Sequence, residues 1–212
     1  MSSTAGPRMP ERRFPSRWKT LTTDPTHSWH AIPKATSGTS APMTRSNRRR
    51  SRTHMNVPEP ERPQMPDSFG FNIEDYPFEP MSWQWVTEQL EAARNYWIAS
   101  TRPSGRPHSV PVWGVWVEDA FHFATDPRGV TARNLLDNPE SVVNLESGDE
   151  VVILEGRFEL HDSTPAIQAA FNAKYDMPWG AEETIPVFTL TVKKALAWTE
   201  ADFPSNATRW RF

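Results

Sequence analysis

The stretch from Trp97 to Asp162 alternates short β-prone runs with tight turns, and this alternation restricts the fold more than any other feature of the chain. The runs rich in apolar, β-branched and aromatic residues lie near 97–101, 108–118, 120–124, 141–146 and 150–161. Turn-forming residues such as Ser147-Gly148-Asp149 separate neighbouring runs, as in β-hairpins. A further long run follows at 185–198. We therefore predict a mainly β fold in which about six strands close into an antiparallel barrel with short peripheral helices.

Three segments carry helical rather than strand periodicity. Ser82 is a suitable N-cap. The apolar residues that follow it at helical spacing are Trp83, Val86, Leu90, Ala93 and Trp97. This pattern predicts an amphipathic helix that runs toward Trp97 and covers one end of the barrel. Shorter helices are expected at about 129–137 and 164–175.

The run from His108 to Glu118 is apolar on both of its faces, which indicates a strand that is covered on both sides. Pro111 and Gly114 interrupt this run. Because proline cannot donate to a strand ladder and glycine weakens a strand interior, we expect a break, a bulge or the close approach of a flat ligand there. Gly156 interrupts a later strand and fits a sharp bend of the barrel.

The loop between the run at 120–124 and the next helix has the composition of an anion site. It reads Ala124-Thr125-Asp126-Pro127-Arg128-Gly129-Val130-Thr131-Ala132-Arg133-Asn134-Leu135. Hydroxyl groups and two arginines enter the first turn of a helix, where backbone N–H groups and the helix dipole also favour negative charge. This combination suits the phosphate of a cofactor. An ordinary capped helix is the alternative interpretation.

Charge is divided unevenly along the chain. Residues 1–55 hold 11 Lys and Arg against 2 Asp and Glu, whereas residues 56–212 hold 12 against 24. Segment 1–58 is rich in Pro, Ser and Arg and has almost no apolar periodicity, so we expect it to be a disordered basic arm. The Pro-rich residues 59–81 are expected to form an irregular lead-in, and residues 82–212 a single domain.

The basic arm allows several interpretations. Runs such as Arg48-Arg49-Arg50 occur in arms that bind nucleic acid or membrane surfaces. An inert tail gives the same composition, as does an extended translation start with Met55 or Met65 as a later start. Because the rest of the chain is acidic, we expect no nucleic acid and no membrane as partner. Whether residues 1–55 belong to the native protein is left open.

The chain lacks the signatures of several other protein classes. It contains no cysteine, which excludes disulfides, thiol catalysis and cysteine zinc sites. No apolar run approaches the roughly 18–20 residues of a membrane span, and the N-terminus has no apolar signal region, so we expect a cytoplasmic protein. The six histidines have no metal-binding spacing, and we expect no metal site.

A set of short motifs is spread over residues 82–212. In chain order they are Thr101-Arg102-Pro103-Ser104-Gly105-Arg106-Pro107-His108, Pro111-Val112-Trp113-Gly114-Val115-Trp116, Pro127-Arg128, Ala132-Arg133-Asn134-Leu135, Asn138-Pro139, Leu145-Glu146-Ser147-Gly148-Asp149 and Thr208-Arg209-Trp210-Arg211-Phe212. In content and order they resemble the pyridoxamine 5'-phosphate oxidase-like split β-barrel superfamily, and within it the flavin and deazaflavin oxidoreductases. The resemblance implies an FMN-binding split barrel that forms a homodimer, with FMN or the deazaflavin coenzyme F-420 in a groove between the two copies.

The resemblance also implies an activity, namely hydride transfer between the cofactor and a small organic substrate. A protein that binds or carries a flavin or haem on the same barrel without turnover is the alternative, because one fold hosts many activities. The residues leave open which cofactor binds, which substrate reacts and in which direction.

Candidate contacts to the cofactor phosphate follow from the resemblance. Relatives use the position of Arg128 and neighbouring basic positions, and we expect Thr125, Arg128 and Thr131 to contact the phosphate, with Arg133 and Asn134 as supporting donors. Many relatives have a lysine where this chain has Thr131. A hydroxyl group gives one hydrogen bond but no charge, so the phosphate is expected to bind more weakly, or through Arg128 and Arg133.

Candidate contacts to the isoalloxazine ring lie on the second strand. The resemblance places the ring against the backbone of Pro111, Val112 and Trp113, with the Trp113 side chain as a platform. An aromatic residue of the core or of the dimer interface is the alternative for Trp113. His108 is a candidate proton donor to the substrate, because histidine changes protonation near neutral pH. A histidine that only donates a hydrogen bond is the alternative.

Overall fold

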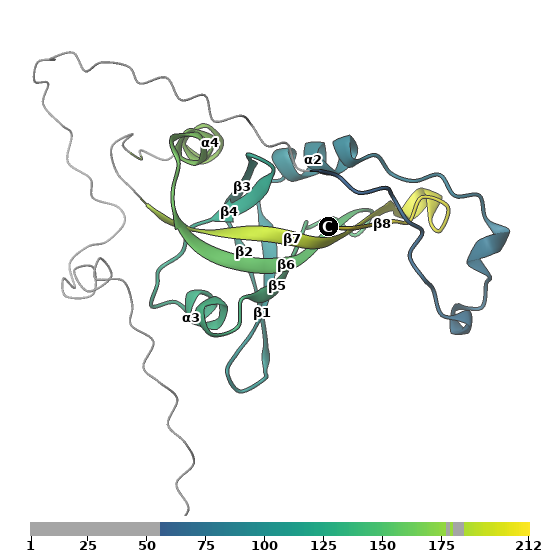
Figure 1. Cartoon of the computed structure of the whole chain (residues 1–212), viewed down its shortest axis with the longest axis horizontal. Helices are drawn as coiled ribbons and strands as arrows, with labels where there is room; N and C mark the ends of the chain where they lie inside the picture. The colour runs from purple at the N-terminus through teal and green to yellow at the C-terminus, as the bar shows by residue number, and fades with distance from the viewer. Residues whose placement is uncertain (1–55, 177–178, 180–184) are drawn as a thin grey trace, which may run out of the picture. The chain divides into compact units, whose positions relative to one another are not determined.

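Within the described part of the chain, eight strands form one antiparallel sheet that curls around an apolar core (Figure 1). The computed structural model describes residues 56–176, 179 and 185–212, so nearly all of the predicted basic arm lies outside the described residues. The strand order is β2-β1-β5-β6-β7-β4-β3, and β8 pairs with β7. The predicted fold class, a mainly β antiparallel split barrel with short peripheral helices, is confirmed.

The strands are β1 (Tyr96–Thr101), β2 (Pro107–Val112), β3 (Gly114–Val117), β4 (Ala120–Phe123), β5 (Glu140–Asn144), β6 (Glu150–Asp162), β7 (Pro186–Thr199) and β8 (Thr208–Arg211). The helices are α2 (Trp83–Ala92), α3 (Val130–Asp137) and α4 (Pro165–Tyr175). α2 and α4 pack against β3, and α3 packs against β1. The helices therefore lie at the periphery of the sheet (Figure 1).

The sheet has eight strands rather than about six for two reasons. The strand predicted over 108–118 divides at Trp113 into β2 and β3, which lie at opposite ends of the strand order. In addition, the C-terminal segment forms β8. Because Trp113 alone joins β2 to β3, the two ends of the curled sheet meet at this residue.

The expectation that the run over 108–118 is covered on both sides is wrong for β2. Alternate residues of β2, among them Ser109 and Pro111, are exposed, because β2 is an end strand that pairs with β1 alone in the described chain. Residues 114–116 of β3 are buried instead. A Cβ atom on Gly114 would lie 2.4 Å from the Phe121 ring, so glycine allows the close approach of β3 and β4.

β6 and β7 are the two longest strands and pair with each other along most of their lengths. Their register shifts between Glu155 and Gly156. A Cβ atom on Gly156 would lie 2.2 Å from the carbonyl oxygen of Thr191. Any residue other than glycine would therefore clash with this oxygen unless the backbone shifted. The bend indicated by Gly156 in the sequence is thus a β-bulge that tightens the curl of the sheet.

α2 packs onto the main core through Val86 and Leu90, which are both buried. The Trp85 N–H donates to Ser82 Oγ over 3.1 Å, which confirms the predicted N-cap. The helix ends at Ala92 and does not reach Trp97. The physical reason is that residues from Tyr96 onward pair with β2 as strand β1, which leaves the Trp97 side chain 37% exposed on the sheet.

A smaller apolar cluster lies beneath α4. Its buried members are Val115, Ile167, Phe171, Tyr175, Trp179, Ile185 and Val187. Because Val115 belongs to β3 and Val187 to β7, this cluster fixes α4 over the edge of the sheet where the strand order ends.

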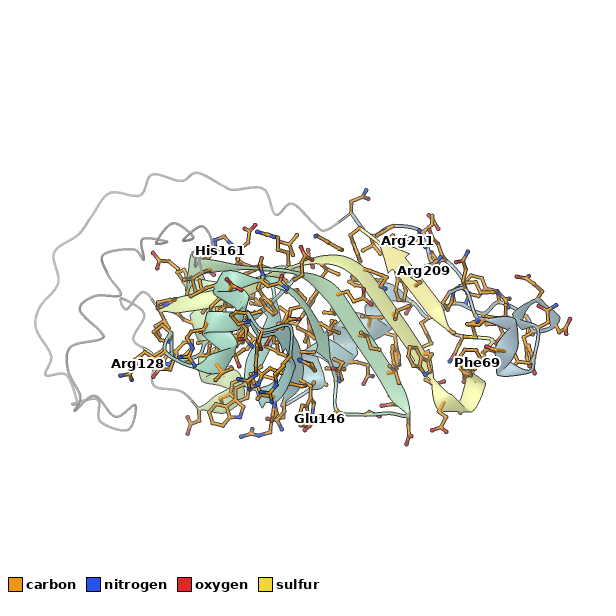
Figure 2. The ribbon with its side chains drawn as sticks, turned by 90° about the horizontal axis from the view of Figure 1, so that it is seen from below. Phe69, Arg128, Glu146, His161, Arg209 and Arg211 are labelled. Atoms are coloured by element: carbon orange, nitrogen blue, oxygen red, sulfur yellow. The ribbon has the colours of Figure 1, made fainter. Side chains whose placement is uncertain are left out.

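The segment over 59–81 is fixed to β8. The Glu61 N–H donates to the Arg209 carbonyl oxygen and the Arg209 N–H donates to the Glu61 carbonyl oxygen, each over 2.8 Å. The Arg209 guanidinium also pairs with the Glu61 carboxylate at 2.8 Å. Two 3-10 helices, Asp67–Phe69 and Ile73–Asp75, interrupt the lead-in. Figure 2 shows Phe69 and Arg128 at opposite ends of the described chain.

Candidate functional site

The start of α3 has no side-chain cap. Gly129 is the N-cap residue, has an extended backbone and provides no side-chain hydrogen bond to the helix. The hydroxyl of Thr125 lies close by, 3.8 Å from the position that a Cβ atom on Gly129 would occupy. The first N–H groups of a helix carry a partial positive charge and point away from the helix body. The predicted anion-binding loop therefore leads into a helix whose N-cap residue gives no side-chain hydrogen bond to its first N–H groups.

Arg128 is at the surface beside this helix start (Figure 2), and its charge is already partly compensated. Its guanidinium donates to Asp126 Oδ1 over 3.1 Å and to Oδ2 over 2.9 Å. The Arg128 N–H donates to Oδ1 as well, over 2.8 Å. These hydrogen bonds hold the pKa of Asp126 below its ordinary value, so the carboxylate stays ionised beside Arg128. An incoming anion would share the guanidinium with Asp126.

Thr131 is the second residue of α3 and connects the helix to the β1–β2 hairpin. Its side chain is buried, and its Oγ1 lies 3.3 Å from Nε2 of His108 on β2. On the other side of the imidazole, His108 Nδ1 lies 3.2 Å from Nη2 of Arg102. We call this chain of contacts, Arg102 to His108 to Thr131, the hairpin relay. Two expected site residues, His108 and Thr131, are thus brought into contact.

The remaining two predicted donors of α3 differ in position. Asn134 is buried, and its Nδ2 donates to Ser100 Oγ on β1 over 3.0 Å. This hydrogen bond fixes α3 to the sheet, which is a structural role. Arg133, one residue earlier, is exposed. The structure therefore does not bring Arg133 and Asn134 together at one point.

The predicted ring-binding residues lie at the exposed end of β2. Pro111 is exposed, and Val112 is half-buried and pairs with Tyr96. Trp113 is 47% exposed, and its ring stacks on Tyr175 with centroids 4.8 Å apart and planes 9° apart. The guanidinium of Arg94 lies 5.9 Å from the Trp113 ring. Trp113 is therefore a partly exposed surface aromatic that α4 holds in place.

An open groove of about 410 Å³ runs over the outer face of the sheet. Ala99 and Thr101 of β1, Val142 of β5 and Glu155 of β6 contribute to its lining. Lys194 pairs with Glu155 at 2.6 Å across this groove. The groove adjoins Pro107 at the base of the hairpin that carries Arg102 and His108.

Two contributors to this region were missed by sequence reasoning. Sequence reasoning gave Arg102 no role of its own, although the five-residue loop over 102–106 between β1 and β2 predicts that residues at its two ends lie close together. Tyr175 was assigned to a helix without a role. Its hydroxyl contacts both the N–H and the carbonyl oxygen of Gly114, and no local sequence signal indicates a contact across 61 positions.

Among the described residues, no group of three or more His, Cys, Asp or Glu side chains is arranged to hold a metal ion. In the same part of the chain, no helix is both long enough and apolar enough to cross a membrane.

Comparison with known proteins identifies one family. The sequence model of pyridoxamine 5'-phosphate oxidase matches residues 83–201, which is more than half of the chain. No curated protein sequence is similar to the chain.

Several solved structures are similar in fold. A conserved hypothetical protein from Mycobacterium tuberculosis is 18% identical with a TM-score of 0.50, over 56% of this chain and 85% of that one. An F-420 reductase is 18% identical with a TM-score of 0.43, over 55% and 98% of the two chains. A haem-binding protein from Mycobacterium smegmatis is 19% identical with a TM-score of 0.45, over 57% and 55%.

Proposed function

This chain belongs to the pyridoxamine 5'-phosphate oxidase family, and we propose that it is an oxidoreductase that transfers hydride between FMN or coenzyme F-420 and a small organic substrate. The observation that carries the proposal is the uncapped start of α3, where the hairpin relay contacts Thr131 and Arg128 immediately precedes the N-cap residue. This arrangement combines helix N–H groups, hydroxyl groups and positive charge, which together suit a phosphate ester.

The residues around the helix start fit a phosphate in part. Thr125 and Thr131 supply hydroxyl groups, and the first N–H groups of α3 supply backbone donors. Arg128 supplies charge that it shares with Asp126. Affinity for the phosphate is therefore expected to come mainly from neutral donors, with less charge than a lysine at position 131 would give.

The flat ring of the cofactor is assigned to the exposed side of β2. Pro111 has no N–H for a further strand, and the side chain of Trp113 offers an exposed aromatic surface. When bound, the cofactor supplies the hydride chemistry, and the protein supplies orientation and exclusion of water. Both ring nitrogens of His108 are in contact with protein side chains, which favours a positioning role over proton donation to the substrate.

We also propose that the protein is a homodimer that covers the outer face of the sheet. Pro111, Trp97, Asn144, Ile153 and Leu196 form one row across five strands in register. Polar and apolar residues are both present on this face, and Trp97 is 37% exposed there. In a two-fold dimer the same surface of each copy meets, so this face of one copy would lie against that of the other and close the groove into an enclosed site.

Titration of the purified full chain with FMN and with coenzyme F-420 tests the proposal. We expect quenching of tryptophan fluorescence by one cofactor, followed by its reduction or reoxidation in the presence of a substrate. Binding without turnover would instead support a flavin carrier, and haem uptake would support a haem-binding protein. Failure to bind either flavin-type cofactor would reject the proposal. Light scattering at micromolar concentration checks the dimer.

A further inference from the structure

We propose that Arg102 and His108 are positioning residues that make the Thr131 hydroxyl a dedicated hydrogen-bond donor to the anionic group of the cofactor. This inference rests on the proposed function. It assigns a role to the hairpin relay, in which Arg102 on the β1–β2 turn contacts His108, and His108 contacts Thr131 on α3.

The first step of the relay fixes the proton of the imidazole. A guanidinium has only donors, so the Arg102 Nη2 must donate to His108 Nδ1, which lies 3.2 Å away. A neutral imidazole has one N–H and one acceptor nitrogen. The proton of neutral His108 is therefore on Nε2.

The second step fixes the hydroxyl group of Thr131. Nε2 carries the proton and lies 3.3 Å from Thr131 Oγ1, so the hydroxyl oxygen accepts from the imidazole. Of the residues that the structure describes, His108 alone bonds Thr131 Oγ1. The hydroxyl hydrogen is therefore directed away from His108, and at the start of α3 a ligand anion is a suitable acceptor.

Burial strengthens both steps. Thr131 is 7% exposed, and Arg102 and His108 are half-buried between the hairpin and α3. Hydrogen bonds in such surroundings are less weakened by water than at the surface, and each bond in a chain polarises the next. The positive charge of Arg102 therefore acts on the ligand through His108 and Thr131, and not by direct contact. Direct charge contacts weaken steeply with salt, and we expect this site to be less sensitive to salt.

Nitrogen-15 NMR of histidine-labelled full-length protein without cofactor tests the relay independently of any binding. His108→Gln identifies the His108 signals among the six histidines. For the neutral imidazole of His108, we expect an Nε2–H tautomer in the wild type and a mixture of tautomers in Arg102→Met, because methionine has no N–H to donate to Nδ1. An Nδ1–H tautomer in the wild type, or an unchanged tautomer in Arg102→Met, would overturn the relay.

Titrations with FMN and coenzyme F-420 test the effect on the ligand. Thr131→Val should weaken the affinity about ten- to a hundredfold, whereas Thr131→Ser, which keeps the hydroxyl, should stay near wild type. Arg102→Met should weaken the affinity about tenfold when Thr131 is present, and should have no further effect in the Thr131→Val background.

Arg106→Met is the matched control, because Arg106 is exposed on the same hairpin turn and its substitution removes the same charge. Equal losses in Arg102→Met and Arg106→Met, or additive losses in the variant that combines Arg102→Met with Thr131→Val, would show a general charge effect and reject the relay. Melting temperatures of all variants identify any that fail to fold, and Thr131→Ser against Thr131→Val then decides the role of the hydroxyl. If the wild type binds neither cofactor, the proposed function fails, and the proposed donor role fails with it, whatever the tautomer.

Discussion

Tyr175 holds Gly114 through both polar atoms of its backbone. The Gly114 N–H donates to Tyr175 Oη over 2.9 Å, and Oη lies 2.7 Å from the Gly114 carbonyl oxygen. The same hydroxyl lies 2.7 Å from the carbonyl oxygen of Arg94. One side chain of α4 therefore fixes the point at which β2 passes into β3.

Removal of this hydroxyl should destabilise the fold. Tyr175→Phe keeps the ring that stacks on Trp113 but leaves the buried Gly114 N–H without its partner. We expect a loss of about 1–3 kcal/mol in the free energy of unfolding, measured by denaturant titration. Tyr76→Phe is the control, because Tyr76 is an exposed residue of the lead-in. Equal stabilities of the two variants would contradict the role of Tyr175.

Release of Arg128 from Asp126 should tighten the binding of a phosphorylated cofactor. Asp126→Asn removes the carboxylate that holds the guanidinium and removes a negative charge beside the uncapped helix start. We expect about a threefold gain in affinity for FMN or coenzyme F-420, and a larger gain at low salt. Asp137→Asn, at the opposite end of α3, is the control. No gain in Asp126→Asn would place the phosphate away from Arg128.

The stability of the fold should decrease as the pH falls below about 6.5, because of His122. Burial lowers the pKa of His122, whose Nδ1 lies 2.9 Å from Thr189 Oγ1 and whose Nε2 lies 3.1 Å from the Val117 carbonyl oxygen. Below the ordinary histidine pKa, His122 of the unfolded chain takes up a proton that His122 of the folded chain does not. The contribution of His122 to stability is therefore fully present above the ordinary pKa, and it is lost as the pH falls toward the folded-state pKa. His122→Gln should flatten this dependence in urea titrations at several pH values, whereas His161→Gln, at an exposed position, should not.

Lys174 should titrate close to neutral pH. Its Nζ donates to Tyr96 Oη over 2.7 Å, and burial lowers its pKa to about 8. After reductive methylation with carbon-13, we expect its NMR signal to titrate near that value. Lys174→Met identifies the signal, and a midpoint at the ordinary lysine value of about 10.4 would contradict the effect of burial.

Truncation should separate the basic arm from the lead-in. A chain that begins at Asn56 keeps the bridge between Glu61 and Arg209, so its melting temperature should equal that of the full chain. A chain that begins at Met65 loses this bridge and the hydrogen bond from Arg62 to the Ile73 carbonyl oxygen. We expect the melting temperature of this shorter chain, measured by calorimetry, to decrease by about 2–4 °C for each kcal/mol lost from the free energy of unfolding. Equal melting temperatures would show that the bridge contributes nothing.

Local periodicity and turn residues predicted most elements closely. The helix expected at 164–175 is α4 at Pro165–Tyr175, and the strand expected at 150–161 is β6 at Glu150–Asp162. Both follow from patterns that a short window of sequence contains. The end of α2 was predicted wrongly, because the apolar spacing continues to Trp97 whereas pairing with β2 starts at Tyr96. Tertiary pairing overrides helical periodicity at this point.

The candidate site was less predictable than the fold. The loop composition indicated Thr131 and Arg128, but it could not show that Asp126 pairs with Arg128 or that His108 contacts Thr131. The pairing with Asp126 is local, since the two charged residues are two positions apart in the sequence. The contact with His108 joins residues 23 positions apart, and it exists because α3 packs on β1 next to β2. Only the packing of the elements determines such a contact.

The junction at Trp113 has a consequence for the order in which the protein folds. β1 to β4 are consecutive in sequence, as are β5 to β7, and each group contains its own hairpin pairings. The pairs that join the groups are β1 with β5 and β4 with β7. Trp113 links the two hairpins of the first group. When the two groups dock, both strand pairs can therefore form together, so the slow formation of long-range contacts takes place in one step.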